Sequence, residues 1–124
     1  QTDVFVGLAI TDTSILDGVT DSIGFRSVDE SAVIFGMTEK NNVESLTAAG
    51  TLVDATYMIV EFYSDGTTLR FYVNGAEVGS QAVSVATMPN DEFLAPTIAF
   101  LTGEATANTL SVKWAKAFQV RETA

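Results

Sequence analysis

The chain has 124 residues, with 16 acidic against 6 basic residues and a formal net charge of −10. This length fits one domain with a single core. So acidic a surface repels the phosphate backbones of nucleic acids and favours a basic partner surface. The chain lacks cysteine and histidine, which excludes disulfides, thiol nucleophiles, histidine-dependent triads and zinc sites built from these residues. No apolar run approaches the ~18–20 residues of a membrane helix, so we expect no membrane partner.

The first apolar run, Val4–Ile10, indicates a strand buried on both faces in the middle of a sandwich. Gln1 leads almost directly into this strand. We therefore expect the chain to be the ordered or C-terminal portion of a longer protein. The next residues, Thr11–Asp21, are rich in Asp, Thr, Ser and Gly around a small apolar pair, Ile15-Leu16, and predict a loop.

Three further strand patterns follow this loop. Ser22–Val28 alternates between apolar and other residues, and a turn predicted at Asp29–Ser31 separates it from the strand pattern of Ala32–Thr38. The polar residues Glu39–Asn42 predict a hairpin turn. Val43–Ala48 is polar enough to predict an edge strand or a strand with an outer face.

The stretch Tyr57–Gly79 contains the strongest structural signal in the chain. It holds two apolar runs with turn pairs at Asp65-Gly66 and Asn74-Gly75, which are typical of type I′ hairpins. A two-residue loop at the first pair predicts that Phe62 faces Leu69. Strand alternation then predicts an apolar face of Met58, Val60, Phe62, Leu69, Phe71 and Val73. The opposite face holds Tyr57, Ile59, Glu61, Tyr63, Arg70 and Tyr72, with Glu61 across from Arg70, and Val78 is expected beside Phe71 on the apolar face.

The last third of the chain predicts two more strands after a long connection, Ser80–Leu94. Thr97–Thr102 is apolar and predicts a buried strand. Thr109–Arg121 predicts a closing strand that carries Trp114 into the core, with a bulge or exposed edge at Lys116. No window shows a convincing helical period. About eight strands in residues 1–124 therefore predict one all-β domain, an antiparallel β-sandwich or jelly roll.

Two acidic patterns are candidate sites of chemistry. Asp12, Asp17 and Asp21 could offer oxygens to calcium, but they lack EF-hand spacing, so a solvated loop is the preferred interpretation. Glycoside hydrolysis needs two carboxyl groups on one concave face. Asp29-Glu30 and Asp91-Glu92 are adjacent pairs, which point to opposite faces of an extended chain. We therefore predict no enzyme activity, no catalytic residue, no metal and no cofactor.

The residues expected to meet a ligand or partner are aromatic and basic. Tyr57, Tyr63 and Tyr72 share the outer face of the predicted hairpin. That face either packs under a strand or a partner subunit, which is the preferred interpretation, or serves as a platform for sugars. Lys113 and Lys116 make the predicted closing strand locally basic. These five residues form the predicted ligand or partner surface.

The motif Asp65-Gly66-x-x-Leu69-x-Phe71-Tyr72-Val73-Asn74-Gly75 resembles the signature hairpin of concanavalin A-like (laminin G-like) β-sandwiches. In those domains the hairpin precedes a buried strand and a closing strand. Thr97–Phe100 with Gly103, and Leu110–Val112, occupy the corresponding places here. The resemblance implies a concanavalin A-like fold and no particular function.

A second resemblance covers most of the chain. Phe5–Asp12, Gly24–Arg26, Pro89–Glu92 and the strand at Leu110 are together similar to structural proteins of tailed bacteriophages, some of which decorate the capsid. This resemblance implies further β-structure before the first strand. The family's closing strand often reads Val-Asp-Tyr where this chain has Lys113-Trp114 after Val112, so the partner of that surface is not implied.

The resemblance implies a non-enzymatic capsid decoration (cement) protein on the virion surface. Its partners would be the major capsid protein and copies of itself, without nucleic acid or membrane. The alternative is a carbohydrate-binding, lectin-like module on a phage tail or a secreted protein. Such a module would use the loop Thr11–Asp21 or the tyrosine face.

Overall fold

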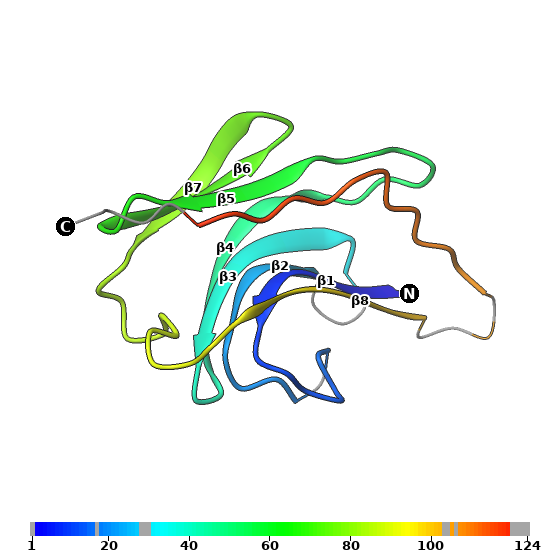
Figure 1. Ribbon diagram of the computed structural model, residues 1–124. Coiled ribbons are helices and arrows are strands. Elements are labelled where there is room, and N and C mark those ends of the chain that lie inside the picture. Colours follow the sequence, from blue (N-terminus) through cyan, green and yellow to red (C-terminus); the bar gives the residue numbers. More distant parts are fainter. Residues whose placement is uncertain (1, 17, 28–30, 103–104, 106, 120–124) are drawn as a thin grey trace.

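Eight β-strands form two antiparallel sheets that face each other in this computed structural model (Figure 1). The structure describes residues 2–16, 18–27, 31–102, 105 and 107–119. The strands are β1 (Thr2–Ala9), β2 (Ser22–Ser27), β3 (Val33–Lys40), β4 (Val43–Thr51), β5 (Val60–Ser64), β6 (Thr68–Val73), β7 (Ala76–Ala82) and β8 (Ala95–Thr102). The described residues contain no helix able to cross a membrane. The expected all-β, antiparallel sandwich is confirmed.

The two sheets are unequal. One holds five strands in the order β4-β3-β2-β1-β8, and the other holds β5-β6-β7. The run at Val4–Ile10 supplies the inner strand β1, and the polar strand β4 lies at an edge, both as predicted. The prediction of a buried strand at Thr97–Thr102 is wrong. β8 is an edge strand and leaves Ile98 and Leu101 exposed, because β1 is its only partner among the described strands.

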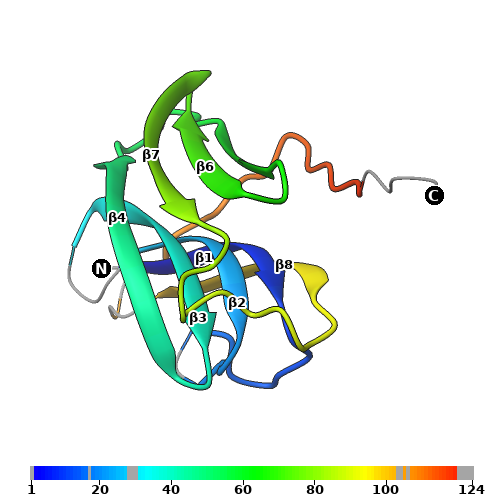
Figure 2. The ribbon, with the colours of Figure 1, turned by 90° about the vertical axis from the view of Figure 1, so that its left-hand side faces the viewer.

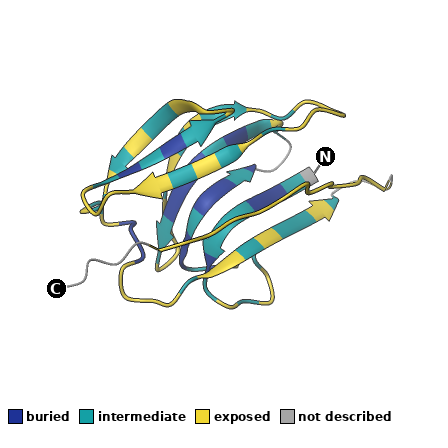
Figure 3. Cartoon of the chain, turned by 45° about the horizontal axis from the view of Figure 1, so that its top comes forward, coloured by how far each residue is buried: buried dark blue, intermediate teal, exposed yellow. Residues whose placement is uncertain are grey.

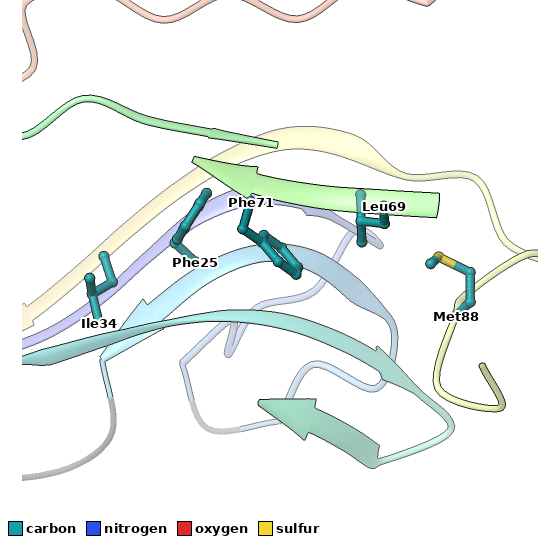
Figure 4. Packing of buried hydrophobic residues seen from close by; sticks show 5 residues of the cluster. All are labelled: Phe25, Ile34, Leu69, Phe71 and Met88. Atoms are coloured by element: carbon teal, nitrogen blue, oxygen red, sulfur yellow. The ribbon is translucent and has the colours of Figure 1, made fainter. Parts of the chain in front are cut away.

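The main core lies between the sheets. Phe25 and Ile34 come from the large sheet, Leu69 and Phe71 from the small sheet, and Met88 from the connection before β8 (Figure 4). The rings of Phe25 and Phe71 meet edge to face, with centroids 5.5 Å apart and an interplanar angle of 78°. Such a pair adds about 0.5–1.5 kcal/mol to the contribution from burial.

The hairpin between β5 and β6 has the predicted faces but a different register. Phe62 pairs with Phe71 rather than with Leu69, so the pairing is shifted by two residues. The reason is the turn, in which Asp65 Oδ1 accepts the backbone N–H groups of Thr67 and Thr68 at 2.8 and 2.7 Å. The Asp65 N–H also donates to the Thr68 carbonyl at 3.2 Å, so the turn is centred on Gly66-Thr67 instead of Asp65-Gly66. A shift of two residues keeps every side chain on its predicted face.

The prediction that Glu61 lies across from Arg70 is therefore wrong. Glu61 lies across from Tyr72, and Arg70 lies across from Tyr63. The second turn is confirmed, since Val73 pairs with Ala76 around Asn74-Gly75 and both turn residues have positive φ, 50° and 83°. A bulge follows on β7, which places Gly79 across from Phe71. Val78 still packs against the core.

The C-terminal segment, defined here as residues 107–119, is not the predicted closing strand. None of its residues belongs to a strand or bridge, and Arg121 lies outside the described residues. Trp114, expected in the core, is 56% exposed. Alternating apolar residues favour a strand only where another strand's edge satisfies the backbone, and no described strand pairs with this segment. The turn expected at Asp29–Ser31 lies mostly outside the described residues.

Candidate functional site

The predicted aromatic residues lie on the outer side of the small sheet. Tyr63 is 55% exposed, and Tyr72 is half-buried on the neighbouring strand. We use the name tyrosine face for the outward residues Ile59, Glu61, Tyr63, Arg70 and Tyr72. Figure 3 shows exposed and less exposed positions alternating along the strands, as expected for a sheet with one side toward solvent. The tyrosine face is thus an open, slightly apolar surface on a rigid support.

Arg70 anchors the centre of the tyrosine face through two carboxylates. Its guanidinium lies 2.8 Å from Asp65 and 3.9 Å from Glu77. Hydrogen bonding from Arg70, then from the Thr68 and Thr67 amides, lowers the pKa of Asp65 to about 2. The hydrogen bond to Asp65 in turn raises the pKa of Arg70. Arg70 is therefore a fixed cation on β6, directly across from Tyr63 on β5.

The two predicted lysines contact aromatic rings in different places. Lys113 Nζ lies 4.1 Å from the centroid of Tyr57, which precedes β5. Lys116 Nζ lies 5.8 Å from the centroid of Trp114, within the C-terminal segment itself. Both distances fit cation–π contacts. The structure thus brings Lys113 and Tyr57 together, while Lys116 contacts a ring that was expected in the core.

A second candidate site lies on the opposite side of the molecule, under the loop that follows β1. Ile15, Leu16 and Val19 of this loop pack over Phe5 and Met37 on the outer side of the large sheet. The loop is held at its end by Asp21, whose buried carboxylate accepts the Thr20 hydroxyl at 2.7 Å. The predicted apolar plug is therefore the cover of a second, smaller hydrophobic cluster.

A cavity of about 430 Å³ opens beside this cluster. Apolar side chains form part of its wall. Its polar lining includes Asp3, Arg26, Glu39, Asn42 and Glu44. The lining is more polar than apolar, whereas most small-molecule sites are mainly apolar with a few polar groups, so this cavity suits a polar ligand.

Besides Asp3, the charged groups that line this cavity come from three adjacent strands. Glu39 and Glu44 lie directly across from each other on β3 and β4. Arg26 holds Glu44 at 2.7 Å. Partial burial, and then the nearby charge of Glu44, raise the pKa of Glu39. The Arg26 Nε atom is buried and has no hydrogen-bond partner among the described residues. In this cavity the Glu44 carboxylate is therefore ion-paired, and the Glu39 carboxyl group takes up a proton more readily than usual. The Nε–H group of Arg26 has no acceptor among the described residues.

The acidic residues weighed as calcium ligands have separate local roles. Asp12 accepts the Ser14 amide at 2.8 Å, which is a turn interaction. Asp21 binds Thr20 and the Asn41 amide, and Asp17 lies outside the described residues. Within the part of the chain that is described, no three acidic side chains gather as metal ligands.

Sequence reasoning missed the pairing of Glu39 with Glu44. The signal was present, because a two-residue turn at Asn41-Asn42 makes residues at equal distances from it face each other. Two carboxyl groups that face each other across a hairpin lie far closer in space than their separation along the chain indicates.

Comparison of the chain with protein-family models, with curated proteins and with solved structures gave no match. Function must therefore be argued from the two sites.

Proposed function

We propose that this protein is a non-enzymatic structural component of a tailed-bacteriophage virion, a decoration protein that binds the assembled head. The phage part of the proposal rests on the sequence resemblance described above. The observation that supports a binding role is the tyrosine face, where Tyr63 is 55% exposed beside Tyr72 and the ion-paired Arg70. Tyrosine and arginine are the residue types that contribute most at protein interfaces.

The tyrosine face suits a protein partner for two geometric reasons. It lies on paired strands, so its side chains are held with little further loss of conformational freedom on binding. Its central cation is fixed by Asp65 and Glu77, and it can meet a partner without leaving a charge unpaired. The acidic remainder of the surface favours a basic partner.

The mechanism of such a protein is mass action. A subunit that binds only the assembled lattice stabilises that lattice by its binding free energy. Its copies would follow the symmetry of the sites that they cover, which is the reason for proposing self-association as well. No chemical step is needed.

The test is co-sedimentation of the protein with undecorated phage heads. Saturable binding at a fixed stoichiometry is the expected result. The variants Tyr63→Ser and Tyr72→Ser should weaken binding about tenfold or more, as for central interface tyrosines. Phe93→Ser is the matched control, because Phe93 is a fully exposed aromatic residue outside the tyrosine face. Absence of head binding, or equal loss in the control, would contradict the proposal.

A second candidate function, carbohydrate binding, is favoured by the cavity beside the loop at residues 11–21. Sugar hydroxyls both donate and accept, so they can pair with the carboxyl groups of Glu39 and Glu44 and with Arg26. Ile15 and Leu16, which are half-buried, offer an apolar wall for a sugar ring. A glycan array run with the same sample separates the two functions. A selective glycan signal lost in Arg26→Gln, without head binding, would replace decoration by sugar binding.

A further inference from the structure

The cavity on the outer side of the large sheet has a mostly acidic lining. Figure 1 and Figure 2 show the loop that lines it on the side of the large sheet away from β6 and β7. Its volume of about 430 Å³ lies within the roughly 300–1,000 Å³ of ligand sites. Among the described residues, the charged groups of the lining are Asp3, Glu39 and Glu44 against Arg26. The lining therefore favours a cationic ligand over an anionic one.

Arg26 pairs with one of these carboxylates and leaves another without a cation. A guanidinium nitrogen of Arg26 lies 2.9 and 2.7 Å from the two carboxylate oxygens of Glu44. Lys40, which follows Glu39 on β3, instead lies 3.1 Å from an aspartate in the connection before β8. Within the described part of the chain no ion pair reaches Glu39, and its hydrogen bond from the Ser22 hydroxyl is long, at 3.5 Å. Glu39 is therefore the carboxylate of this cavity that a bound cation can meet.

The surroundings of Glu39 support the same conclusion. Partial burial, then the charge of Glu44 and to a smaller extent that of Asp21, raise the pKa of Glu39, whereas Arg26 acts in the opposite direction. A cation bound beside Glu39 would stabilise its ionised form against all three of these effects. Binding of a cation and ionisation of Glu39 therefore favour each other.

Apolar side chains in the same cavity fit an alkyl chain. Ile15 and Leu16 line it from the loop and are half-buried, and Leu101 lines it from β8 and is 53% exposed. All three side chains thus have apolar surface left for contact. A lysine side chain packs its methylene groups on such surface and holds its ammonium group at polar neighbours. The lining therefore fits a primary ammonium group on an alkyl stem.

A buried donor indicates that the ligand also carries an acceptor. The Nε–H group of Arg26, a residue that lines the cavity, is buried and meets no acceptor among the described residues. Folded proteins rarely leave such a group unmatched. The backbone carbonyl of a lysine residue is a neutral acceptor at the base of the alkyl stem. The cavity therefore suits a lysine within a polypeptide better than it suits a free amine.

We propose that this cavity binds the side chain of a lysine on a partner protein. The ammonium group meets Glu39, the methylene stem lies on Leu16, and a backbone carbonyl accepts from Arg26 Nε. The net charge of −10 agrees with a basic partner. This inference names a chemistry for the partner in the proposed function, and it rests on that function only for the identity of the partner. The cavity and the tyrosine face lie on opposite sides of the molecule, so each can be tested separately.

Titration of the isotope-labelled chain with N-acetyl-lysine methylamide, followed by nuclear magnetic resonance, tests the lysine site without phage heads. Saturable shifts are expected at the amide signals of the cavity, including the side chain of Asn42. N-acetyl-norleucine methylamide has the same stem and peptide groups without the ammonium group, so it should bind about tenfold more weakly. n-Butylamine has the ammonium group and stem without the peptide groups, and it should also bind more weakly than the lysine compound.

Two variants of the cavity connect the binding to its carboxylates. Glu39→Gln keeps the size of the side chain and removes its charge, so it should weaken binding of the lysine compound about tenfold or more. Glu92→Gln removes the same charge from an exposed position outside the cavity and is the matched control. Glu44→Gln frees Arg26 to pair with Glu39 and should also weaken binding, which gives a second measurement if the spectrum of Glu39→Gln shows a folding defect.

Three results would overturn the lysine site: no saturable shifts with the lysine compound, equally tight binding of the norleucine compound, or undiminished binding in Glu39→Gln. Binding of n-butylamine as tight as that of the lysine compound would replace the partner lysine by a free amine. All of these results leave head binding through the tyrosine face unaffected, so the failure of one proposal is distinguished from the failure of the other.

Discussion

Phe71 packs directly on the backbone of Gly36. A Cβ atom at Gly36 would lie 2.6 Å from Cγ of the Phe71 ring, closer than carbon atoms approach each other. Phe25, which lies across from Gly36 on β2, contacts the same ring edge to face, so the ring has little freedom to move toward it. Because Gly36 has no side chain, β3 leaves room at this position for the fully buried ring of Phe71.

Gly36→Ala should therefore lower the free energy of unfolding by about 1–3 kcal/mol, as overpacked cores do. Urea denaturation measures this loss. Gly50→Ala is the control, because a Cβ there meets Met58 at an ordinary 3.6 Å. In the double variant Gly36→Ala/Phe71→Leu the two losses should be less than additive. Equal effects at Gly36 and Gly50 would contradict the packing argument.

The turn at Asp65 predicts a dependence of stability on pH. The pKa of Asp65 is lowered to about 2 from an ordinary 3.8, so ionised Asp65 favours the folded state. This stabilisation is complete above pH 3.8 and is lost as the pH falls toward 2. Asp65→Ala should therefore lower the urea midpoint at pH 7, and the difference should shrink in acid.

Comparing Asp65→Ala with Asp65→Asn separates the two roles of Asp65, which are to accept the turn amides and to pair with Arg70. Asp65→Asn keeps an oxygen that can accept the Thr67 and Thr68 amides but loses the ion pair with Arg70, so its effect at pH 7 should be smaller. Asp54→Asn, at another exposed aspartate, is the control. A loss in Asp65→Ala that does not change with pH would count against the ion pair.

Glu39 predicts the opposite dependence on pH. Its pKa is raised above 4.5, mainly by partial burial, so the protonated form favours the folded state. Stability from this group is present below pH 4.5 and is lost as the pH rises through the raised pKa. Glu39→Gln should thus raise the urea midpoint at pH 8 relative to the unaltered chain, with a smaller gain at pH 4.

Glu44→Gln is the informative comparison for Glu39. It removes the carboxylate that lies 2.7 Å from Arg26, so it should lower stability at pH 8. Replacing Glu39 is thus expected to raise the stability at pH 8, whereas replacing Glu44 is expected to lower it. Equal effects of the two variants at pH 8 would contradict the different environments assigned to them.

Thr38 links the large sheet to the connection that carries Met88. Its buried hydroxyl lies 2.7 Å from the hydroxyl of Thr87 and donates to Gln81 at 2.7 Å. Thr38→Val leaves Thr87 without this partner and should cost about 1–3 kcal/mol in urea denaturation. Thr38→Val/Thr87→Val should recover part of the loss, because both polar groups are then absent. A double variant as unstable as the sum of the single ones would contradict this pairing.

The continuous apolar run of β1 was enough to predict its inner position, and the polarity of β4 its edge position. The alternation of apolar residues in the other strands was enough to predict the sandwich. It also placed Phe71 and Leu69 inward and Tyr63 and Tyr72 outward. These features depend on the two-residue period of extended backbone, which is a local property. The error in the register between β5 and β6 left the faces unchanged, because a shift of two residues preserves that period.

The remaining features depend on contacts between distant residues. The carboxylate of Asp65 decided the turn geometry, and the five-to-three arrangement of the sheets decided that β8 and β5 have open edges. The cavity joins Arg26, Glu39 and Glu44 from three strands. Whether an apolar segment such as residues 107–119 pairs with a strand depends on which edge is free to accept it. Local sequence determines which side of a strand is apolar, whereas only the tertiary structure determines what that side meets.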